Sequence, residues 1–176
     1  VVKLTTDNEF NTKNLLTKSE ISSTLVEQVT QKSYDASNRL QCEVRRMNPL
    51  KYNSLPSSAC TLTAGDVGEF GEDRITYSEY DALSRLTKTI SGYGTDDAGI
   101  DIEIGYTDNG EVDYRKDGNG NLTDYAYDGV DRLYKTTYPD YSYESNTYDN
   151  NGNLKTLRKR DGKVLTHTYD GLNLRS

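Results

Sequence analysis

The chain has 176 residues, with 21 Lys and Arg against 28 Asp and Glu, a net charge of −7 at pH 7. One domain is the default at this length, and so acidic a chain lacks the clustered cations that nucleic-acid binding needs. Only 33% of residues are hydrophobic, yet there are 15 tyrosines. This composition argues against both a thick apolar core and disorder, and it predicts a thin sheet faced with tyrosine.

No apolar stretch approaches the roughly 18 residues of a membrane-spanning helix. The first residues, Val1, Val2 and Lys3, are not typical of a signal peptide. We therefore expect no membrane span and no nucleic-acid partner.

One motif organises the chain: an anchor Tyr, an Asp directly after it, and an apolar residue six positions after the Tyr. Such self-similarity marks a repeat architecture, and from Tyr106 onward the anchors recur every 21 residues. The repeat-defining residues are Tyr34, Asp35, Arg39 and Leu40; Tyr80, Asp81, Arg85 and Leu86; Tyr127, Asp128, Arg132 and Leu133; Tyr148, Asp149, Gly152 and Leu154; and Tyr169 and Asp170.

Residues 1–33 are predicted to hold a degenerate repeat. Phe10 and Leu16 have the spacing of an anchor and its apolar partner. A short helix over residues 14–28 is the alternative, since Leu15, Leu16 and Leu25 would suit one. The anchor spacing favours the hairpin.

From residue 34 onward, each repeat carries two turn signals. Four residues after the anchors come types that tolerate a left-handed backbone, and the Asp can accept main-chain N–H groups, so we predict a type I turn with a bulge. These residues are Asn38, Ser84, Gly110, Asp131, Gly152 and Asn173. The second signal includes Asn119-Gly120 and Asp161-Gly162, which favour two-residue hairpin turns, and Tyr141 stands where glycine is usual. Two strands per repeat predict an antiparallel sheet of about 10 to 14 strands.

Two segments interrupt the period. The segment of about residues 48–73 contains Pro49, Pro56 and several glycines. It is predicted to form an inserted loop that packs over one face of the sheet. Residues 91–101 are predicted to be a lengthened second turn. Apart from these segments, we treat residues 1–176 as a single repeat domain.

The sequences YDASNRL (34–40), YDALSRL (80–86), YDGVDRL (127–133) and DGNGNLTDYAYDG (117–129) resemble the RHS or tyrosine-aspartate (YD) repeat over about residues 34–176. This resemblance implies an all-β fold, in which repeated antiparallel β-hairpins form a curved, open β-strip that is a segment of a hollow shell. The chain departs from the repeat pattern at Thr107, at Tyr141 and at the reversed pair Leu174-Arg175.

Members of this family include bacterial competition toxins, the shell component of insecticidal toxin complexes, and animal teneurins. The resemblance therefore implies a structural module of a large secreted or cell-surface protein, with the rest of its own longer chain and an enclosed C-terminal effector as partners. The alternative is an extracellular carbohydrate-binding or adhesion module, in which exposed Tyr, Asp and Asn side chains contact glycans. The terminal strands would be unprotected edges, so we also expect self-association at high concentration.

No catalytic or cofactor-binding set is recognisable. His167 is the only histidine and has no partner motif, so we expect no enzyme and no cofactor. Asp117, Asn119, Asn121 and Asp128 match positions of a calcium loop, but Leu122 stands where that loop requires glycine. Ordinary turn chemistry explains these residues, and we expect no metal.

Cys42 and Cys60 are the two cysteines. Cys42 is in phase with Leu40 and Val44 and should face the apolar stripe, whereas Cys60 lies in the inserted loop. Shells of this family act largely outside the cytosol, where cysteines oxidise, so we expect a disulfide if the loop folds back over that face. Two separate buried thiols are the alternative.

Overall fold

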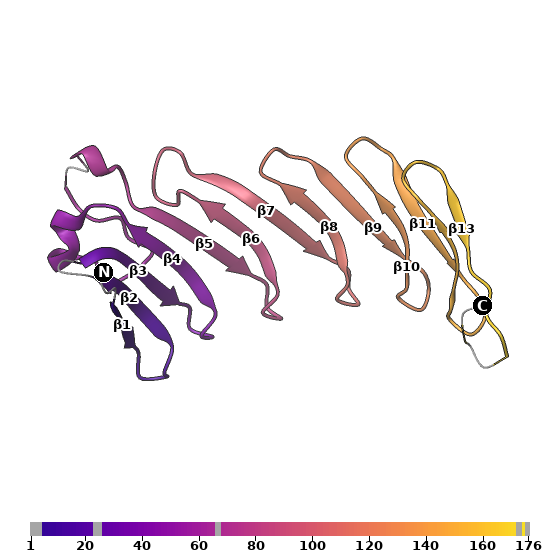
Figure 1. Ribbon diagram of the computed structural model, residues 1–176, viewed down its shortest axis with the longest axis horizontal. Helices are drawn as coiled ribbons and strands as arrows, with labels where there is room; N and C mark the ends of the chain where they lie inside the picture. Colours follow the sequence, from indigo (N-terminus) through magenta and orange to yellow (C-terminus); the bar gives the residue numbers. More distant parts are fainter. Residues whose placement is uncertain (1–4, 23–25, 66–67, 172–173, 175–176) are drawn as a thin grey trace. The chain divides into compact units, whose positions relative to one another are not determined.

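The computed structural model describes residues 5–22, 26–65, 68–171 and 174 (Figure 1). In this part of the chain there are thirteen strands and two 3₁₀ helices, η1 (Pro49–Ser54) and η2 (Gly68–Phe70). The strands are β1 (Thr5–Phe10), β2 (Leu16–Ser22), β3 (Val26–Tyr34), β4 (Leu40–Arg46), β5 (Arg74–Tyr80), β6 (Leu86–Ser91), β7 (Gly99–Tyr106), β8 (Val112–Asp117), β9 (Leu122–Tyr127), β10 (Leu133–Thr137), β11 (Tyr143–Tyr148), β12 (Leu154–Arg158) and β13 (Val164–Thr166).

The strand order in the sheet is the order in the chain, from β1 to β13. Neighbouring strands pair antiparallel, as in β3 with β4 and in β11 with β12. This meander confirms the predicted all-β fold of repeated antiparallel hairpins and the predicted number of strands. No helix in the described residues is long and apolar enough to cross a membrane.

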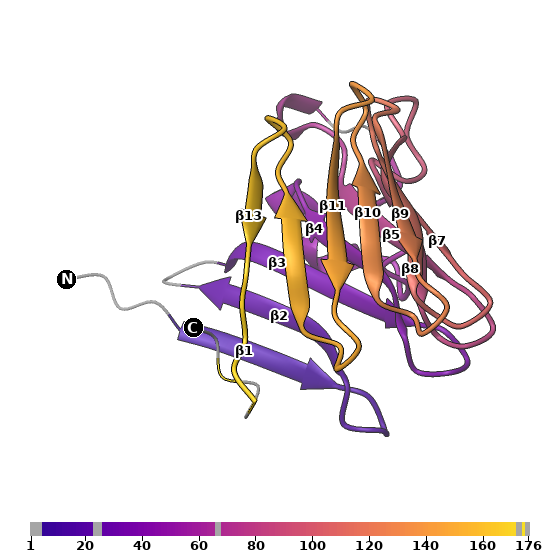
Figure 2. The same ribbon diagram turned by 90° about the vertical axis from the view of Figure 1, so that its right-hand side faces the viewer.

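The chain divides into two compact units, residues 1–102 and 103–176. The first contains β1 to β6 and the start of β7, and the second contains the rest of β7 and β8 to β13. Within the second unit, the hairpins lie side by side in chain order (Figure 2).

The loop after each anchor has the predicted geometry. The N–H of Asp35 donates to the carbonyl of Arg39 at 2.9 Å, and the N–H of Asn38 donates back to the carbonyl of Asp35 at 3.0 Å. The fourth residue after the anchor has a positive φ, for example 64° at Asn38 and 87° at Gly152. The strand register shifts beside Tyr34, which is the expected bulge. The predicted turns at Asp35–Asn38, Asp81–Ser84, Asp128–Asp131 and Asp149–Gly152 are confirmed.

The predicted type of the second turn is wrong. A two-residue Asn-Gly turn needs a positive φ at both residues, but of this pair only Gly120 has one, at 82°. Asp117 N–H bonds to Asn121 carbonyl and Gly120 N–H to Asp117 carbonyl, which is the bonding pattern of the first turns. The physical reason is Asp117, whose carboxylate accepts the N–H groups of Asn119 and Asn121 and so stabilises the longer loop.

The first unit has a core between the sheet and the segment that joins β4 to β5, residues 47–73. Cys42 and Val44 of β4 and Ile75 of β5 are buried against Ala59 of this segment. Tyr77 and Tyr93 pack on the cluster and stack on one another, with ring centroids 4.4 Å apart. The inserted segment therefore supplies the second layer that an isolated sheet lacks.

The second unit is built differently. Among its described residues only Ile104 is buried, and every strand from β8 to β13 presents partly or fully exposed side chains. With so little apolar burial, turn geometry and polar contacts between hairpins must contribute most of its stability.

We predict that Gly152→Val lowers the free energy of unfolding by about 1 kcal/mol or more, because a β-branched residue is disfavoured at positive φ. A Cβ at Gly152 would meet Arg132 Nη1 at 3.8 Å, an ordinary contact, so strain and not collision causes the loss. Urea denaturation measures the change. Asn151→Val, one position earlier, is the control and should cost less; equal losses at the two positions would contradict the turn register.

Candidate functional site

The hydroxyl groups of five anchor tyrosines donate to the main chain of the preceding repeat. In every case shown, the acceptor is the carbonyl of the apolar residue six positions after the preceding anchor. The bonds are Tyr34 to Leu16 (2.9 Å), Tyr80 to Leu40 (2.8 Å), Tyr127 to Val112 (2.9 Å), Tyr148 to Leu133 (2.7 Å) and Tyr169 to Leu154 (3.0 Å). The carbonyls of Leu16, Leu40, Leu133 and Leu154 lie beside a register shift, where a bulge disrupts the strand ladder, so the hydroxyl satisfies an acceptor that the ladder leaves available.

The Asp after each anchor organises its own loop. One oxygen of Asp35 accepts the N–H groups of Ser37 and Arg39, and the other accepts Arg39 Nε at 2.6 Å. The main-chain N–H and the guanidinium of Arg39 lower the pKa of Asp35 below its ordinary value. Asp81 with Arg85 and Asp128 with Arg132 repeat this arrangement.

Asparagine replaces the arginine in other loops. Asp149 bonds to the side-chain amide of Asn153 at 3.0 Å, which lowers the pKa of the carboxyl in the same direction. Asp170 accepts the N–H of Leu174 at 2.9 Å, the same contact four residues ahead that Asp35 makes with Arg39. Asn173 and Arg175 lie outside the described residues.

Arginine also links one repeat to the next. Arg39 Nη1 donates to the carbonyl of Asp81 at 2.9 Å, and its guanidinium lies over the Tyr80 ring, 4.8 Å from the centroid. Arg132 lies over Tyr148 at 4.5 Å. The predicted repeat-defining residues therefore form one contact system, in which Asp fixes a loop while Tyr and Arg join neighbouring hairpins.

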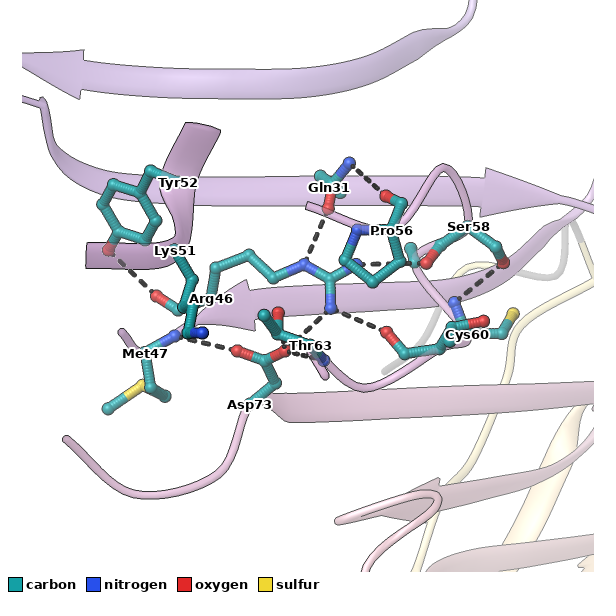
Figure 3. A network of polar contacts seen from close by, with 12 residues as sticks. Gln31, Arg46, Met47, Lys51, Tyr52, Pro56, Ser58, Cys60, Thr63 and Asp73 are labelled. Carbon is teal, nitrogen blue, oxygen red and sulfur yellow. Dashed lines mark hydrogen bonds and ion pairs between the residues drawn. The ribbon is translucent and has the colours of Figure 1, made fainter. Parts of the chain in front are cut away.

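Arg46 at the end of β4 is the centre of a second system (Figure 3). Its side chain is 0% exposed, and Nη1 lies 2.8 Å from Oδ2 of Asp73, which is 3% exposed. The guanidinium also donates to Gln31 Oε1 at 2.6 Å and to two carbonyls of the inserted segment, Thr61 at 2.7 Å and Ser58 at 3.0 Å. A buried cation is tolerated here because a carboxylate and three neutral oxygens surround it.

Asp73 is satisfied in the same way. It accepts the N–H of Met47 at 3.0 Å and both the N–H and the hydroxyl of Thr63, at 2.8 and 2.6 Å. Burial by itself would raise the pKa of this carboxyl, but the hydrogen bonds from Thr63 and Arg46 lower it below the ordinary value. The charged pair therefore closes both ends of the inserted segment onto the sheet.

Three further contacts hold the inserted segment. Cys42 and Cys60 form a disulfide with a Cα–Cα distance of 5.3 Å, the pairing that the sequence left open. Ser33 Oγ accepts the N–H of Ala59 at 2.8 Å, and Tyr52 donates its hydroxyl to the carbonyl of Arg46 at 3.0 Å. These contacts tie β3 and β4 to the inserted segment.

The Arg46–Asp73 pair was not predicted from the sequence. The signal was present, because Arg46 is in phase with Cys42 and Val44 on the face expected to be apolar. A cation on such a face needs a buried anion, and Asp73 stands directly before the next strand.

The calcium-like residues are used in a turn. Asp117 bonds to the N–H groups of Asn119 and Asn121 through one oxygen and to the Asn121 amide through the other. In the described part of the chain, no three His, Cys, Asp or Glu side chains form a group that could hold a metal ion.

No family model and no curated protein sequence match the chain. Among solved structures, it is similar to a chain of the TcdB2–TccC3–Cdc42 crystal structure, with a TM-score of 0.51 and 13% identity over 99% of its residues. Chains of TcdB2–TccC3 without its hypervariable C-terminal region and of the Photorhabdus luminescens Tc holotoxin pore score 0.48 and 0.42, each with 15% identity and 99% coverage. The chain spans 12% of each of these proteins.

The chain shares its fold with part of the TcdB2–TccC3 chain. An identity of 13% shows the fold alone.

We predict that the disulfide stabilises the protein by roughly 3 kcal/mol, since it closes a loop of 18 residues' separation in the unfolded chain. Thermal unfolding with and without reductant measures the effect, and a Cys42→Ala/Cys60→Ala variant, which should not respond to reductant, is the control. Two free thiols per chain in denatured, unreduced protein would refute the bridge.

We predict that Arg46→Met lowers the free energy of unfolding by about 3 to 5 kcal/mol, because it leaves the Asp73 carboxylate buried and unpaired. Arg45→Met is the matched control, since Arg45 is exposed on the same strand, and it should change stability by less than about 0.5 kcal/mol. Adding Asp73→Leu to Arg46→Met should recover part of the loss. Equal effects of the two arginine substitutions in urea denaturation would contradict the role of the pair.

Proposed function

We propose that this chain is a structural module of an RHS/YD-repeat shell, which encloses or presents a toxin or effector of a large secreted or cell-surface protein. Its role would be architectural and not catalytic. The observation that carries this proposal is the hydrogen bond from five anchor tyrosines to the main chain of the preceding repeat. Such a contact is useful only in a structure that grows by adding hairpins.

The polarity of the second unit supports the proposal that it forms part of a shell wall. Its strands bury almost nothing and carry partly exposed polar side chains, so water can wet both faces. A wall that separates an interior from the surroundings has this requirement, whereas a domain with a hydrophobic centre does not. The disulfide supports a location outside the cytosol, where such bonds persist.

The fold similarity to the TcdB2–TccC3 chain agrees with the resemblance of the sequence to the shell repeats. Because the chain spans 12% of that protein, the proposed shell would contain many more hairpins than this segment supplies. The rest of a longer chain is thus the first partner that we propose, and an enclosed C-terminal effector is the second.

The carbohydrate-binding alternative receives no support from the anchor tyrosines. Their hydroxyls bond to carbonyls, and guanidinium groups lie over the rings of Tyr80 and Tyr148. Among the described tyrosines, Tyr134 and Tyr141 are exposed, with 42% and 88% of their surface accessible to solvent. Glycan contact through these two stays a prediction.

Protease protection in the longer protein that the proposal requires provides the test. We predict that the effector region resists proteinase K in the intact protein and is cleaved in a Tyr127→Phe/Tyr148→Phe variant, which loses two bonds between repeats. Each lost hydroxyl should also cost about 0.5 to 1.5 kcal/mol of stability.

Tyr134→Phe is the matched control, because this exposed tyrosine makes no contact between repeats among the described residues, and it should leave the effector protected. An effector region cleaved as readily in the unaltered protein as in the double variant would overturn the proposal.

A further inference from the structure

The two cysteines of the disulfide differ in their access to solvent. Cys42 is 0% exposed and lies in the apolar cluster with Val44 and Ile75. Cys60 belongs to the inserted segment and is only partly buried where it packs against that cluster. A thiol reduces a disulfide when its thiolate attacks one of the two sulfurs, and the rate depends on which sulfur can be reached. Cys60 is therefore the sulfur that a thiol in solution meets first.

The burial of Cys42 also opposes the reaction. Attack at Cys60 Sγ would expel Cys42 as a thiolate among apolar side chains. An anion without water or a partner is strongly disfavoured there, and a poor leaving group slows thiol exchange. The bond is thus protected while the inserted segment covers Cys42.

Arg46 fastens the inserted segment on both sides of Cys60. Its guanidinium donates to the carbonyl of Ser58, two residues before the cysteine, at 3.0 Å (Figure 3). It also donates to the carbonyl of Thr61, one residue after the cysteine, at 2.7 Å. This stretch can lift from the sheet only if both bonds break, which would leave a fully buried guanidinium with fewer acceptors.

Two further contacts hold the same part of the segment. The N–H of Ala59 donates to Ser33 Oγ at 2.8 Å. Asp73, which pairs with Arg46, accepts the N–H and the hydroxyl of Thr63 at 2.8 and 2.6 Å. The polar network and the disulfide therefore fasten one short stretch of chain, and opening of the first decides access to the second.

We propose that the Cys42–Cys60 bond is a gated thiol-exchange site, and that Arg46 keeps the gate closed. When residues 58–61 lift from the sheet, the thiolate of a small thiol such as glutathione attacks Cys60 Sγ. The bond between the two cysteines breaks, and Cys42 leaves as a thiolate that takes a proton from water. A second glutathione thiolate then attacks the mixed disulfide on Cys60, which yields oxidised glutathione and a second free cysteine.

A bond protected in this way persists in the presence of thiols for as long as the segment stays closed. Its redox state then reports whether the segment has opened. This proposal does not depend on the proposed shell function.

The rate of reduction by excess glutathione at neutral pH tests the gate, with free cysteines counted by alkylation and mass spectrometry of the full chain. Reduction of the native protein should be at least about a hundredfold slower than that of the urea-denatured protein, because a well-fastened segment opens rarely. Arg46→Met should be reduced at least about tenfold faster than the unaltered protein, since it loses the charged hydrogen bonds to the segment. Arg46→Met/Asp73→Leu, which leaves no unpaired buried charge, should show the same acceleration and serves if the single variant does not fold.

Two controls separate the gate from a general loss of stability. Arg45→Met, at an exposed position of the same strand, should change the rate by less than about twofold. Gly152→Val strains a loop of the second unit, away from the inserted segment, and should leave the rate unchanged.

The mixed disulfide identifies the sulfur that is attacked. After a brief exposure to glutathione and alkylation, peptide mapping should find glutathione on Cys60 and the alkyl group on Cys42. The reverse pattern would contradict the proposed direction of attack.

A native protein that is reduced as fast as the urea-denatured protein would overturn the proposal. So would Arg46 variants that are reduced at the rate of the unaltered protein. If Gly152→Val accelerates reduction as much as Arg46→Met, thiols reach the bond only by global unfolding, and there is no local gate.

Discussion

The structure depends on the need to satisfy main-chain carbonyls where each hairpin loop shifts the strand register. The left-handed residue in the loop closes the hairpin but disrupts the ladder beside the anchor, as at Tyr34 and Leu40. The tyrosine hydroxyl of the next repeat reaches the carbonyl there, as in Tyr80 to Leu40. Phenylalanine has the same ring and no donor. Tyrosine recurs because the geometry of one hairpin creates the acceptor that the next hairpin uses.

The two units show how a thin sheet can be stabilised in different ways. In the first, the inserted segment buries Cys42, Val44 and Ile75, and the Arg46–Asp73 pair fixes both of its ends. In the second, none of the described residues forms a segment that covers the sheet, and side chains such as Arg132 and Tyr148 contact each other between hairpins. Apolar side chains occur on β4 where a second layer shields them; polar ones take their place where water reaches the sheet.

The same loop geometry that is ordinary for glycine makes Tyr141 exceptional. Asn38 and Asp131 occupy equivalent left-handed positions, but each has a polar side chain that a neighbouring loop contacts. Tyr141 has the free-energy cost of a positive φ, but no neighbouring loop contacts its side chain among the described residues.

The sequence by itself determined the features that depend on near neighbours. The period, the all-β meander and the loops at Asp35 and Asp149 follow from carboxylates that bond two and four residues ahead and from residue types that accept positive φ. The turn at Asn119-Gly120 was mistaken for a two-residue hairpin because the Asn-Gly signal ignores the competing Asp117 carboxylate. Only the tertiary structure decided that Arg46 meets Asp73, that Tyr80 meets Leu40, and that Cys42 meets Cys60. These partners lie between 18 and 40 residues apart, and their pairing depends on how strands align and where the inserted segment folds, which no local pattern encodes.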